Sequence, residues 1–521
     1  MISRKETTSP LSRTDILLTV LIGIGALALY IRTLAPSLLW GDSAEFQTLS
    51  YTLGMTHPSG YMTQIMIGKL FTLIPVDNIA YRVNLMSAFF GALAAAQVYL
   101  IVRLLGGWRV AGISASMMLG LMPNFWWRAV IAESYAPAAG MTASVWLCVL
   151  LWKRFDNWRF LFLAGLLGGL SIGIHSTVVM TAASVLVYMA LTARQRADWF
   201  GAAAGAILGT ALTFSFFLFL DAHDPPSSIY NTVYRPSLSA LGLTPGQFNT
   251  PLKHFFAIFP ANQFWTYYFT AAPEEVGRRL IEYISFFPVW GNALIILGAF
   301  TLFINGKWRE GLYPLIAFLI IWGFAVTVAF SIYREFYVPV AVFVFAWLGA
   351  GASASLDGLS RLLEQVHVKG GMMRNVVIGI VSILLITLPI YESREDLVLA
   401  IRRGYTTFIK RDHIYTIFAP DKAIQDAMKV IRHVEDNAIV FAEWDKLYSY
   451  IYTAHIEEGR TGVAFHEATI TDDPHLAGSA LDYIDANIDN RPIYFAVFMP
   501  ELTERYQVEQ INESLYRIRR K

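Results

Sequence analysis

The feature that most limits the fold of this chain is a series of apolar runs, each about twenty residues long, that recurs over roughly the first three quarters of the sequence. The 521 residues are 55% hydrophobic and only 15% charged. Each run has the length that an α-helix needs to cross a hydrocarbon layer about 30 Å thick. The sequence therefore predicts an all-α polytopic membrane bundle.

We place about eleven membrane-spanning helices along the chain. Their expected positions are 15 to 35, 82 to 104, 109 to 126, 136 to 152, 159 to 174, 176 to 192, 199 to 220, 289 to 304, 311 to 331, 336 to 355 and 374 to 391. The segments from 159 to 192 are individually short, and cationic residues flank both of their ends. This pattern favours a hairpin that returns to the same side of the membrane.

The charges of the short loops predict the orientation of the bundle. Cationic residues fall on one side, which should be the cytoplasm, and they are Arg4, Lys5, Arg13, Arg103, Arg109, Lys153, Arg154, Arg194, Arg196, Lys307, Arg309, Arg361, Lys369 and Arg374. The first span reads as uncleaved, so the N-terminus is expected in the cytoplasm. An odd number of spans then places the C-terminal part of the chain on the outer face.

Composition excludes several other classes of protein. The net charge is +1 and no basic tract occurs, so nucleic-acid binding is not expected. Cys148 is the single cysteine, so an intrachain disulfide is impossible. The polar C-terminal part has no phosphate-cradling glycine loop, no metal-spaced His/Cys cluster and no nucleophile elbow.

Two acids directly follow the first apolar run, in the segment Trp40-Gly41-Asp42-Ser43-Ala44-Glu45-Phe46. A carboxylate pair held just outside a bilayer, in a chain that otherwise avoids charge, is more typical of chemistry than of a solvated surface. Asp42 is therefore the first candidate for a catalytic residue, and Glu45 is the second.

These acids begin the first outer loop, which covers residues 36 to 81. Apolar positions at helical spacing predict a helix from Asp42 to Leu53, and a second amphipathic run extends from Tyr61 to Leu73. Between them lies the turn-prone segment from His57 to Gly60. The second run contains Lys69, so it lies in the membrane interface more easily than it spans. Two interfacial helices would form a platform beside the active cavity.

Two later outer segments hold polar candidates. Arg128 and Glu133 lie between the third and fourth spans, and an ordinary exposed ion pair explains them as well as a binding role does. His175 lies at the bend of the short hairpin. A lone histidine there is more often a hydrogen-bonded structural residue than a catalyst, although its outer location leaves a functional role open.

A long outer loop, residues 221 to 290, contains Arg235. Its length exceeds what a connector needs, which suits either a lid over a substrate groove or a folded cap without chemistry. Arg334 lies in a further short outer turn. It is well placed to meet a lipid phosphate, and interfacial anchoring explains it equally well.

The chain becomes polar after the last span, which predicts two domains, residues 1–391 in the membrane and residues 392–521 outside it. Short apolar runs at 438 to 442 and 492 to 498 are consistent with buried strands, and residues 420 to 434 read as a helix. We expect a small extracytoplasmic α/β domain that recognises the acceptor or supports the site.

Several segments together resemble a known family, namely residues 41–46, 53–61, 82–88, 126–135 and 169–177. They are similar to a multispanning family once catalogued as a domain of unknown function, which resembles the eukaryotic transmembrane O-mannosyltransferases and is grouped with the GT-C glycosyltransferases. The resemblance covers roughly residues 15 to 195.

The resemblance implies a GT-C fold with an essential acid at the start of the first outer loop, a position that Asp42 matches. Glu45 matches the family's second acid, and His57 falls in its bend motif. The chain departs from the pattern at Ser59 and Met62, where many relatives have proline, and this difference bears on loop geometry and substrate choice.

The implied reaction moves a sugar, with mannose as a candidate, from a polyprenyl-phosphate donor to an acceptor hydroxyl, with a protein Ser or Thr as the favoured acceptor. Asp42 would act as general base in an inverting transfer. The polyprenyl phosphate is a good leaving group, so neither a metal nor a cofactor is expected. The candidate substrate-binding residues are His57, Lys69, Arg128, Glu133, His175, Arg235 and Arg334, and Lys69, Arg128, Arg235 or Arg334 could receive the phosphate.

Other functions remain open at this stage. The acceptor could instead be a lipid or a cell-envelope glycan. A transporter or flippase could use an acid near the membrane as a proton relay, but such proteins often have paired halves, and no duplication is visible. A noncatalytic scaffold would not explain why Asp42 and Glu45 lie just outside the membrane. The expected location is a bacterial inner membrane.

Overall fold

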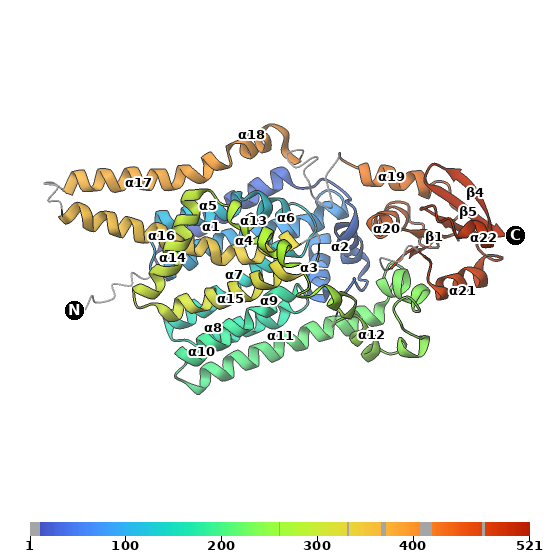
Figure 1. Cartoon of the computed structure of the whole chain (residues 1–521), viewed down its shortest axis with the longest axis horizontal. Coiled ribbons are helices and arrows are strands. Elements are labelled where there is room, and N and C mark those ends of the chain that lie inside the picture. Colours follow the sequence, from blue (N-terminus) through green and yellow to red (C-terminus); the bar gives the residue numbers. More distant parts are fainter. Residues whose placement is uncertain (1–10, 260, 331–332, 366–370, 406–418, 471–474) are drawn as a thin grey trace.

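A computed structural model describes the whole chain except residues 1–10, 260, 331–332, 366–370, 406–418 and 471–474. Long helices run side by side along the longest axis of the molecule, and a small α/β unit caps one end (Figure 1). The first described residues of the chain lie at the opposite end from this unit. The polytopic bundle with a small C-terminal α/β part, predicted from sequence, is confirmed.

Seven helices in the described ranges are long and apolar enough to cross a membrane, or eight if a bent pair counts as one span. They are α1 (Arg13–Thr33), α4 (Ile79–Leu104), α7 (Tyr135–Phe155), α11 (Arg196–His223), α15 (Trp308–Thr327), α16 (Tyr337–Gln365) and α17 (Gly371–Glu392). The bent pair is α13 (Pro273–Ser285) with α14 (Val289–Ile304), at an angle of 99°. All stretches that the sequence assigned to spans fall on apolar helices.

The remaining predicted spans are shorter apolar helices, α5 (Arg109–Leu121), α8 (Arg159–Ser171), α9 (Ser176–Met180) and α10 (Ala182–Thr192). The expected span from 109 to 126 ends early, at Leu121. Pro123 starts a separate helix, α6 (Pro123–Ala129), because proline favours the first turn of a helix and cannot continue one. This break places the following loop, with Glu133, beside the outer segments.

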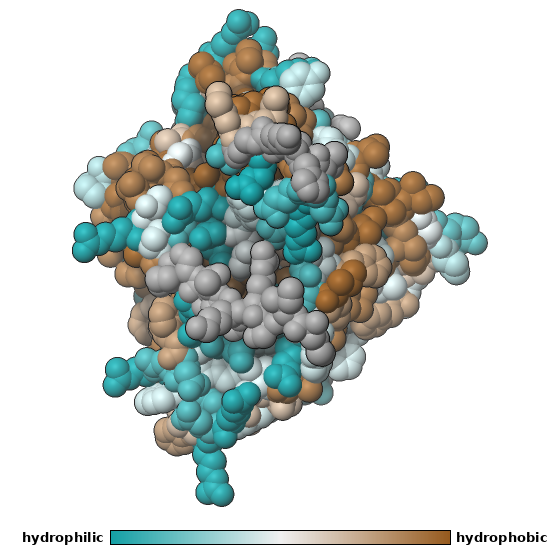
Figure 2. Space-filling model, turned by 90° about the vertical axis from the view of Figure 1, so that its left-hand side faces the viewer, coloured by the Kyte–Doolittle hydropathy of each residue, from teal (hydrophilic) through white to brown (hydrophobic). Residues whose placement is uncertain are grey.

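The outer flanks of the bundle are apolar. Only 11% of the apolar window of α1 and of α17 is buried, and both helices expose large aliphatic side chains such as Leu17, Leu21 and Ile383. Figure 2 views the end of the molecule opposite the C-terminal unit and shows hydrophilic residues distributed over this end, with hydrophobic residues between them and around the sides. This distribution is what a lipid-embedded bundle requires.

Some helices pack with their backbones in close contact. A Cβ at Gly205 of α11 would lie 2.0 Å from the carbonyl oxygen of Phe162 in α8, and a Cβ at Gly298 of α14 would lie 1.8 Å from that of Trp347 in α16. Small residues at such crossings are typical of membrane bundles, where helix association depends on van der Waals packing.

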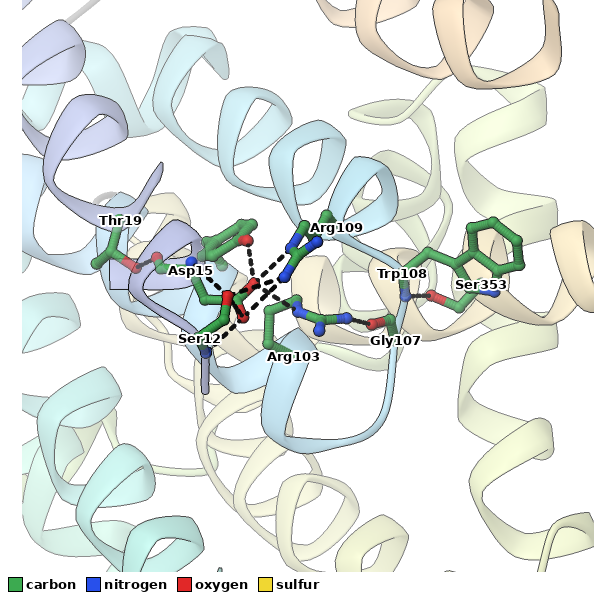
Figure 3. Close-up of polar contacts among 9 residues, drawn as sticks. Ser12, Asp15, Thr19, Arg103, Gly107, Trp108, Arg109 and Ser353 are labelled. Atoms are coloured by element: carbon green, nitrogen blue, oxygen red, sulfur yellow. Dashed lines mark hydrogen bonds and ion pairs between the residues drawn. The ribbon is translucent and has the colours of Figure 1, made fainter. Parts of the chain in front are cut away.

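A polar cluster holds α1, α4 and α5 together at the N-terminal end of the bundle (Figure 3). Asp15 is fully buried, and its Oδ1 accepts hydrogen bonds from the Nε atoms of Arg103, at 3.0 Å, and Arg109, at 2.9 Å, and from the Tyr99 hydroxyl, at 2.8 Å. Ser12 and Asp15 also form a capping box at the start of α1. The Asp15 carboxylate thus has hydrogen-bond partners within the protein.

The first outer loop forms two helices near the predicted positions, α2 (Gly41–Thr52) and α3 (Met62–Thr72). The expectation that both lie in the membrane interface differs from the structure, because most of α2 is buried. It packs against α3 and against α20 (Trp444–Ile451) of the C-terminal part. The C-terminal unit covers α2 and so excludes it from the surface.

The long outer loop is folded into short helical segments. These are η1 (Tyr230–Tyr234), η2 (Arg235–Ser237), η3 (Pro245–Gln247), α12 (Pro251–Ile258) and η4 (Asn262–Tyr267), and a further turn, η5 (Tyr333–Phe336), precedes α16. Ile229, Tyr230 and Val233 share one hydrophobic core with α2 and with the C-terminal unit. The loop therefore joins the two parts of the molecule.

The C-terminal unit contains a five-stranded sheet in the order β2-β1-β3-β5-β4. Its strands are β1 (Ile439–Ala442), β2 (Ala464–Glu467), β3 (Ile493–Phe495), β4 (Tyr506–Asn512) and β5 (Leu515–Arg520), and its helices are α19 (Lys422–Ile431), α20, η7 (Tyr452–Glu457), α21 (Gly478–Asn487) and α22 (Leu502–Arg505). Helix α18 (Arg394–Arg403), which precedes this unit, contacts α1 and α17 of the bundle. Strands β2, β1 and β3 are parallel, and Ala442 pairs with Glu467. The expected strands at 438 to 442 and 492 to 498 contain β1 and β3.

Candidate active site

A cavity of about 580 Å³ lies where the outer loops meet the C-terminal unit. Its lining is mostly aromatic and aliphatic, with a few convergent polar groups, as is typical of ligand sites. The polar lining residues are Asp42, His57, Ser59, Tyr61, Tyr135, His175, Ser176, Tyr234, Tyr268, Trp444 and Glu467. The cavity thus combines residues from both ends of the sequence.

Asp42 enters this cavity from the first turn of α2. Gly41 has a φ of 59°, a conformation that favours glycine, and it turns the chain into the helix immediately before the acid. The Asp42 Oδ1 accepts a hydrogen bond of 3.0 Å from the Trp444 indole Nε1, and its Oδ2 lies 4.0 Å from the His57 Nε2. The side chain is 25% exposed, so it is held in place and accessible from the cavity.

His57 links Asp42 to the second acid of the pair. Its Nδ1 lies 2.5 Å from the Glu45 Oε2, and its backbone N–H donates to the Glu45 Oε1 at 2.7 Å. Burial opposes protonation of the imidazole, but the carboxylates of Glu45 and Asp42 outweigh this effect and raise the pKa of His57 to about 9. The imidazole is therefore an imidazolium at neutral pH.

A second group of charged residues lies close to the first. The Arg128 guanidinium contacts the Glu335 carboxylate directly and lies 4.0 Å from the Glu133 Oε1. Burial raises the pKa of Glu133, and the charges of Glu335 and Asp42 act in the same direction while Arg128 opposes them. Arg128 lies behind Tyr135, 5.9 Å from its ring centre, and does not line the cavity.

His175 serves the local structure and also faces the cavity. Its Nδ1 accepts a hydrogen bond from the Thr177 backbone N–H at 3.2 Å, which caps α9. Burial, helped by the positive charge of His57, lowers the pKa of His175 to about 3, so its ring is neutral. His175 therefore has the structural role considered from the sequence, and it also lines the cavity.

The structure brings together most of the residues that the sequence selected, namely Asp42, Glu45, His57, Arg128, Glu133 and His175. Lys69 lies elsewhere, where its Nζ donates to the Tyr51 carbonyl oxygen at 2.6 Å. Arg235 lies outside the cavity lining and pairs with Asp224 at 2.6 Å.

Arg334 also turns away from the cavity. Its Nε lies 2.5 Å from the Glu282 Oε1, and half of its side chain is exposed. No lysine or arginine occurs among the described residues that line the cavity. The binding roles predicted for Lys69, Arg128, Arg235 and Arg334 stay predictions, and His57 is the lining residue to which the geometry gives a positive charge.

Three residues at the site were missed from sequence. Trp444 and Glu467 follow strands of the C-terminal unit, and Glu335 stands next to the Arg334 that was selected. The sequence could have indicated Trp444 and Glu467, because ligands of parallel sheets bind beyond the carboxyl ends of the strands. No signal indicated that this edge meets the membrane bundle.

Comparisons with known proteins agree with this geometry. Residues 42–198 match the family described as the N-terminal domain of protein O-mannosyl-transferase TMEM260. The chain is 36% identical over 110 residues to the mouse (Mus musculus) protein O-mannosyl-transferase TMEM260, and 26% identical over 156 residues to its counterpart in Dictyostelium discoideum. These segments cover 21% and 29% of this chain but only 16% and 19% of the two relatives. The matched part of the chain thus spans less than one fifth of the length of these relatives.

Solved structures resemble the whole molecule. ArnT from Cupriavidus metallidurans, bound to undecaprenyl phosphate, matches with a TM-score of 0.55 and 13% identity over 97% of this chain and 98% of that chain. The oligosaccharyltransferase AglB from Archaeoglobus fulgidus matches with a TM-score of 0.55 and 13% identity over 93% of this chain and 70% of that one. The chain therefore has the GT-C type of membrane fold.

The resemblance of the N-terminal part to the O-mannosyltransferases, inferred from its motifs, is confirmed. The matched family segment begins at Asp42, the acid that the structure places in the cavity.

Proposed function

We propose that this chain is an inverting membrane glycosyltransferase that moves a hexose, mannose being the first candidate, from a polyprenyl phosphate to a hydroxyl of a protein Ser or Thr. The observation that carries the proposal is the Asp42 carboxylate, held at a cavity wall between Trp444 and His57. A fixed and accessible carboxylate in a largely apolar cavity is suited to general-base catalysis.

In the proposed step, the acceptor oxygen forms a bond with the anomeric carbon of the sugar as its proton passes to the Asp42 carboxylate. The bond between that carbon and the phosphate oxygen breaks, and its electron pair leaves with the polyprenyl phosphate. Attack from the face opposite the phosphate inverts the anomeric centre. General-base catalysis of this kind typically contributes about 10²- to 10⁴-fold to the rate.

His57 is the residue that we assign to the departing phosphate. Glu45 keeps the imidazole protonated, and a fixed positive charge in a largely apolar cavity stabilises the developing negative charge. The phosphate of the intact donor carries one negative charge and leaves with two, so this interaction strengthens as the reaction proceeds. The step needs no metal ion, and a metal-independent reaction is part of the proposal.

The apolar part of the cavity supports a lipid-linked donor. Phe259, Phe264, Phe324 and Phe330 line it together with Ile229 and Met180. A polyprenyl chain offers only apolar surface to such walls. Among the structural neighbours, ArnT is bound to undecaprenyl phosphate, and AglB is in complex with an inhibitory peptide and a dolichol phosphate.

The proposed orientation puts this cavity outside the cytoplasm. Arg103, Arg109 and Lys307 gather at the opposite end of the bundle, where Arg103 and Arg109 contact Asp15 and Lys307 bonds to the Leu105 carbonyl oxygen. An excess of cationic loop residues marks the cytoplasmic side of membrane proteins. We assign the C-terminal unit to the extracytoplasmic face of a bacterial inner membrane.

A reconstituted transfer assay tests the proposal. Purified protein in lipid vesicles receives radiolabelled polyprenyl phosphate mannose and a peptide rich in Ser and Thr, and labelled glycopeptide is the expected product. Label on a lipid or a cell-envelope glycan, with none on the peptide, would replace the acceptor part of the proposal. Movement of labelled donor across sealed vesicles without any transfer would instead indicate a flippase.

A further inference from the structure

Glu467 is a buried carboxyl group in the cavity wall to which the transfer step above gives no task. It ends strand β2, and the residue is 8% exposed. Its side chain has no hydrogen-bond or ion-pair partner in the described part of the protein, yet it lines the same cavity as Asp42 and His57. Buried polar groups are nearly always paired, so an unpaired one that faces a cavity indicates a ligand.

The fold holds this carboxyl group in a fixed position. The neighbouring His466 is buried, and its Nδ1 contacts the Asn231 carbonyl oxygen at 3.0 Å while its Nε2 contacts the Tyr483 hydroxyl at 3.2 Å. Ala442 pairs with Glu467 in parallel register, two residues before Trp444. Glu467 and the indole that holds Asp42 therefore lie at the carboxyl ends of adjacent strands, the edge at which parallel sheets bind ligands.

The protonation state of Glu467 indicates which kind of chemical group this ligand offers. Burial, with a further contribution from the charge of Glu45, raises the pKa of Glu467 to about 8, so the group is mainly neutral at pH 7. A neutral carboxyl group donates one hydrogen bond and accepts others. A sugar hydroxyl has the same dual character, whereas the ionised phosphate of the donor only accepts hydrogen bonds and the polyprenyl chain has no polar atoms.

We infer that Glu467 binds a hydroxyl group of the sugar on the donor lipid, and that the C-terminal unit thereby determines which sugar the enzyme accepts. This assignment rests on the proposed function for the identity of the donor. It gives the C-terminal unit a role at the sugar, in addition to the acceptor recognition expected from sequence. Sites that hydrogen-bond a substrate hydroxyl discriminate strongly against analogues that lack it.

Binding measurements test this inference without any transfer reaction. The full chain in detergent is titrated with polyprenyl phosphate mannose and, separately, with the methyl ester of the same polyprenyl phosphate, a sugar-free diester that carries the same single negative charge. We expect the mannosylated lipid to bind wild-type protein about tenfold more tightly, because one or two hydrogen bonds to the sugar are worth this factor. Equal affinity of the wild-type protein for both lipids would overturn the inference.

Variants assign the difference to the carboxyl group. Glu467→Ala should reduce the tenfold preference to less than about twofold while its affinity for the sugar-free lipid is unchanged. Glu467→Gln should retain most of the preference, since an amide also donates and accepts. The matched control is Glu509→Ala, which removes a surface carboxylate of the same sheet that pairs with Arg519 at 3.0 Å. Its preference should equal that of the wild type.

Two results would contradict the assignment, namely an undiminished preference in Glu467→Ala or an equal loss of affinity for both lipids. If Glu467→Ala does not fold, Glu467→Asp replaces it, because it withdraws the carboxyl group by one methylene and should lose several-fold of the preference. A sugar preference that depends on Glu467 in a protein without transferase activity would reject the proposed reaction and keep this inference.

Discussion

The two ends of the bundle each hold an aspartate among charged neighbours, and the surroundings of the two aspartates differ. Asp15 is fully enclosed and paired with Arg103 and Arg109, so its charge is compensated inside the protein (Figure 3). Asp42 is partly exposed to a cavity and stands among acids that outnumber the cations around them. These acids are Glu45, Glu133, Glu335 and Glu467, and the cations are His57 and Arg128.

This difference distinguishes a cluster that stabilises the helix bundle from a cluster that is suited to binding a substrate. A buried carboxylate with all its partners present stabilises the arrangement of helices and needs nothing further. An excess of acids around a cavity is costly in the free protein, since burial and like charges disfavour ionisation. Such an arrangement is retained where a bound substrate uses it. The comparison predicts opposite responses at the two ends.

The largest expected effect comes from Asp42→Asn. The amide keeps the shape and the hydrogen bond from Trp444 but accepts no proton, so kcat should fall by about 10²- to 10⁴-fold. Donor affinity and thermal unfolding should not change. Asp77→Asn is the matched control, because Asp77 is an exposed acid of the same outer loop outside the cavity. Near-normal turnover by Asp42→Asn would show that Asp42 is not the general base.

His57→Gln should reduce kcat by about 10- to 100-fold, because a positive charge near the phosphate is lost. The pH profile gives the sharper test. The folded-state pKa of about 9 means that the imidazolium persists below that pH and is lost above it, so wild-type kcat should fall as pH rises through about 9. Glu45, Asp42 and Glu133 supply the negative charges that raise this pKa. In the variant this alkaline decline should disappear; an identical decline would assign it to another group.

Trp444→Phe should have a smaller effect. The ring remains beside His57, but the hydrogen bond to the Asp42 Oδ1 is lost, and kcat should fall about five- to tenfold with KM unchanged. Trp199→Phe on the exposed surface of α11 should show wild-type kinetics. A rise in KM with unchanged kcat would mean that Trp444 binds substrate and does not position the base.

The smallest effect is expected from removal of divalent metals. The proposed step uses His57 and Asp42 to handle the charge and the proton, so a chelator such as EDTA should change the transfer rate by less than about twofold. Loss of activity that added Mg²⁺ or Mn²⁺ restores would show that the His57 assignment is incomplete.

Much of the bundle could be predicted from sequence because the membrane imposes a strong rule. A span must be long, apolar and helical, and this requirement located the helices and made Asp42 and Glu45 stand out just after the first of them. Pro123 was a local signal that the span from 109 ends early, and the apolar pattern alone overlooked it. The burial of α2 could not be predicted, because it depends on packing against later elements.

That the C-terminal unit supplies part of the site could not be predicted from the sequence. Asp42 and Trp444 are 402 positions apart in the sequence, and neither local pattern indicates the contact. Lys69 and Arg235 were selected for charge and outer location alone, but each has a local partner, Tyr51 or Asp224. Charge predicts that a residue needs a partner, whereas only the fold determines which partner it has.

The most direct test compares Asp15 and Asp42 in one experiment. Asp15→Asn and Asp42→Asn are each assayed for thermal unfolding and for mannosyl transfer. We predict that Asp15→Asn unfolds more readily, by about 1–3 kcal/mol, and transfers at the wild-type rate, while Asp42→Asn unfolds normally and transfers at least about 100-fold more slowly. A normal transfer rate in Asp42→Asn, or an equal loss of transfer in both variants, would contradict the account.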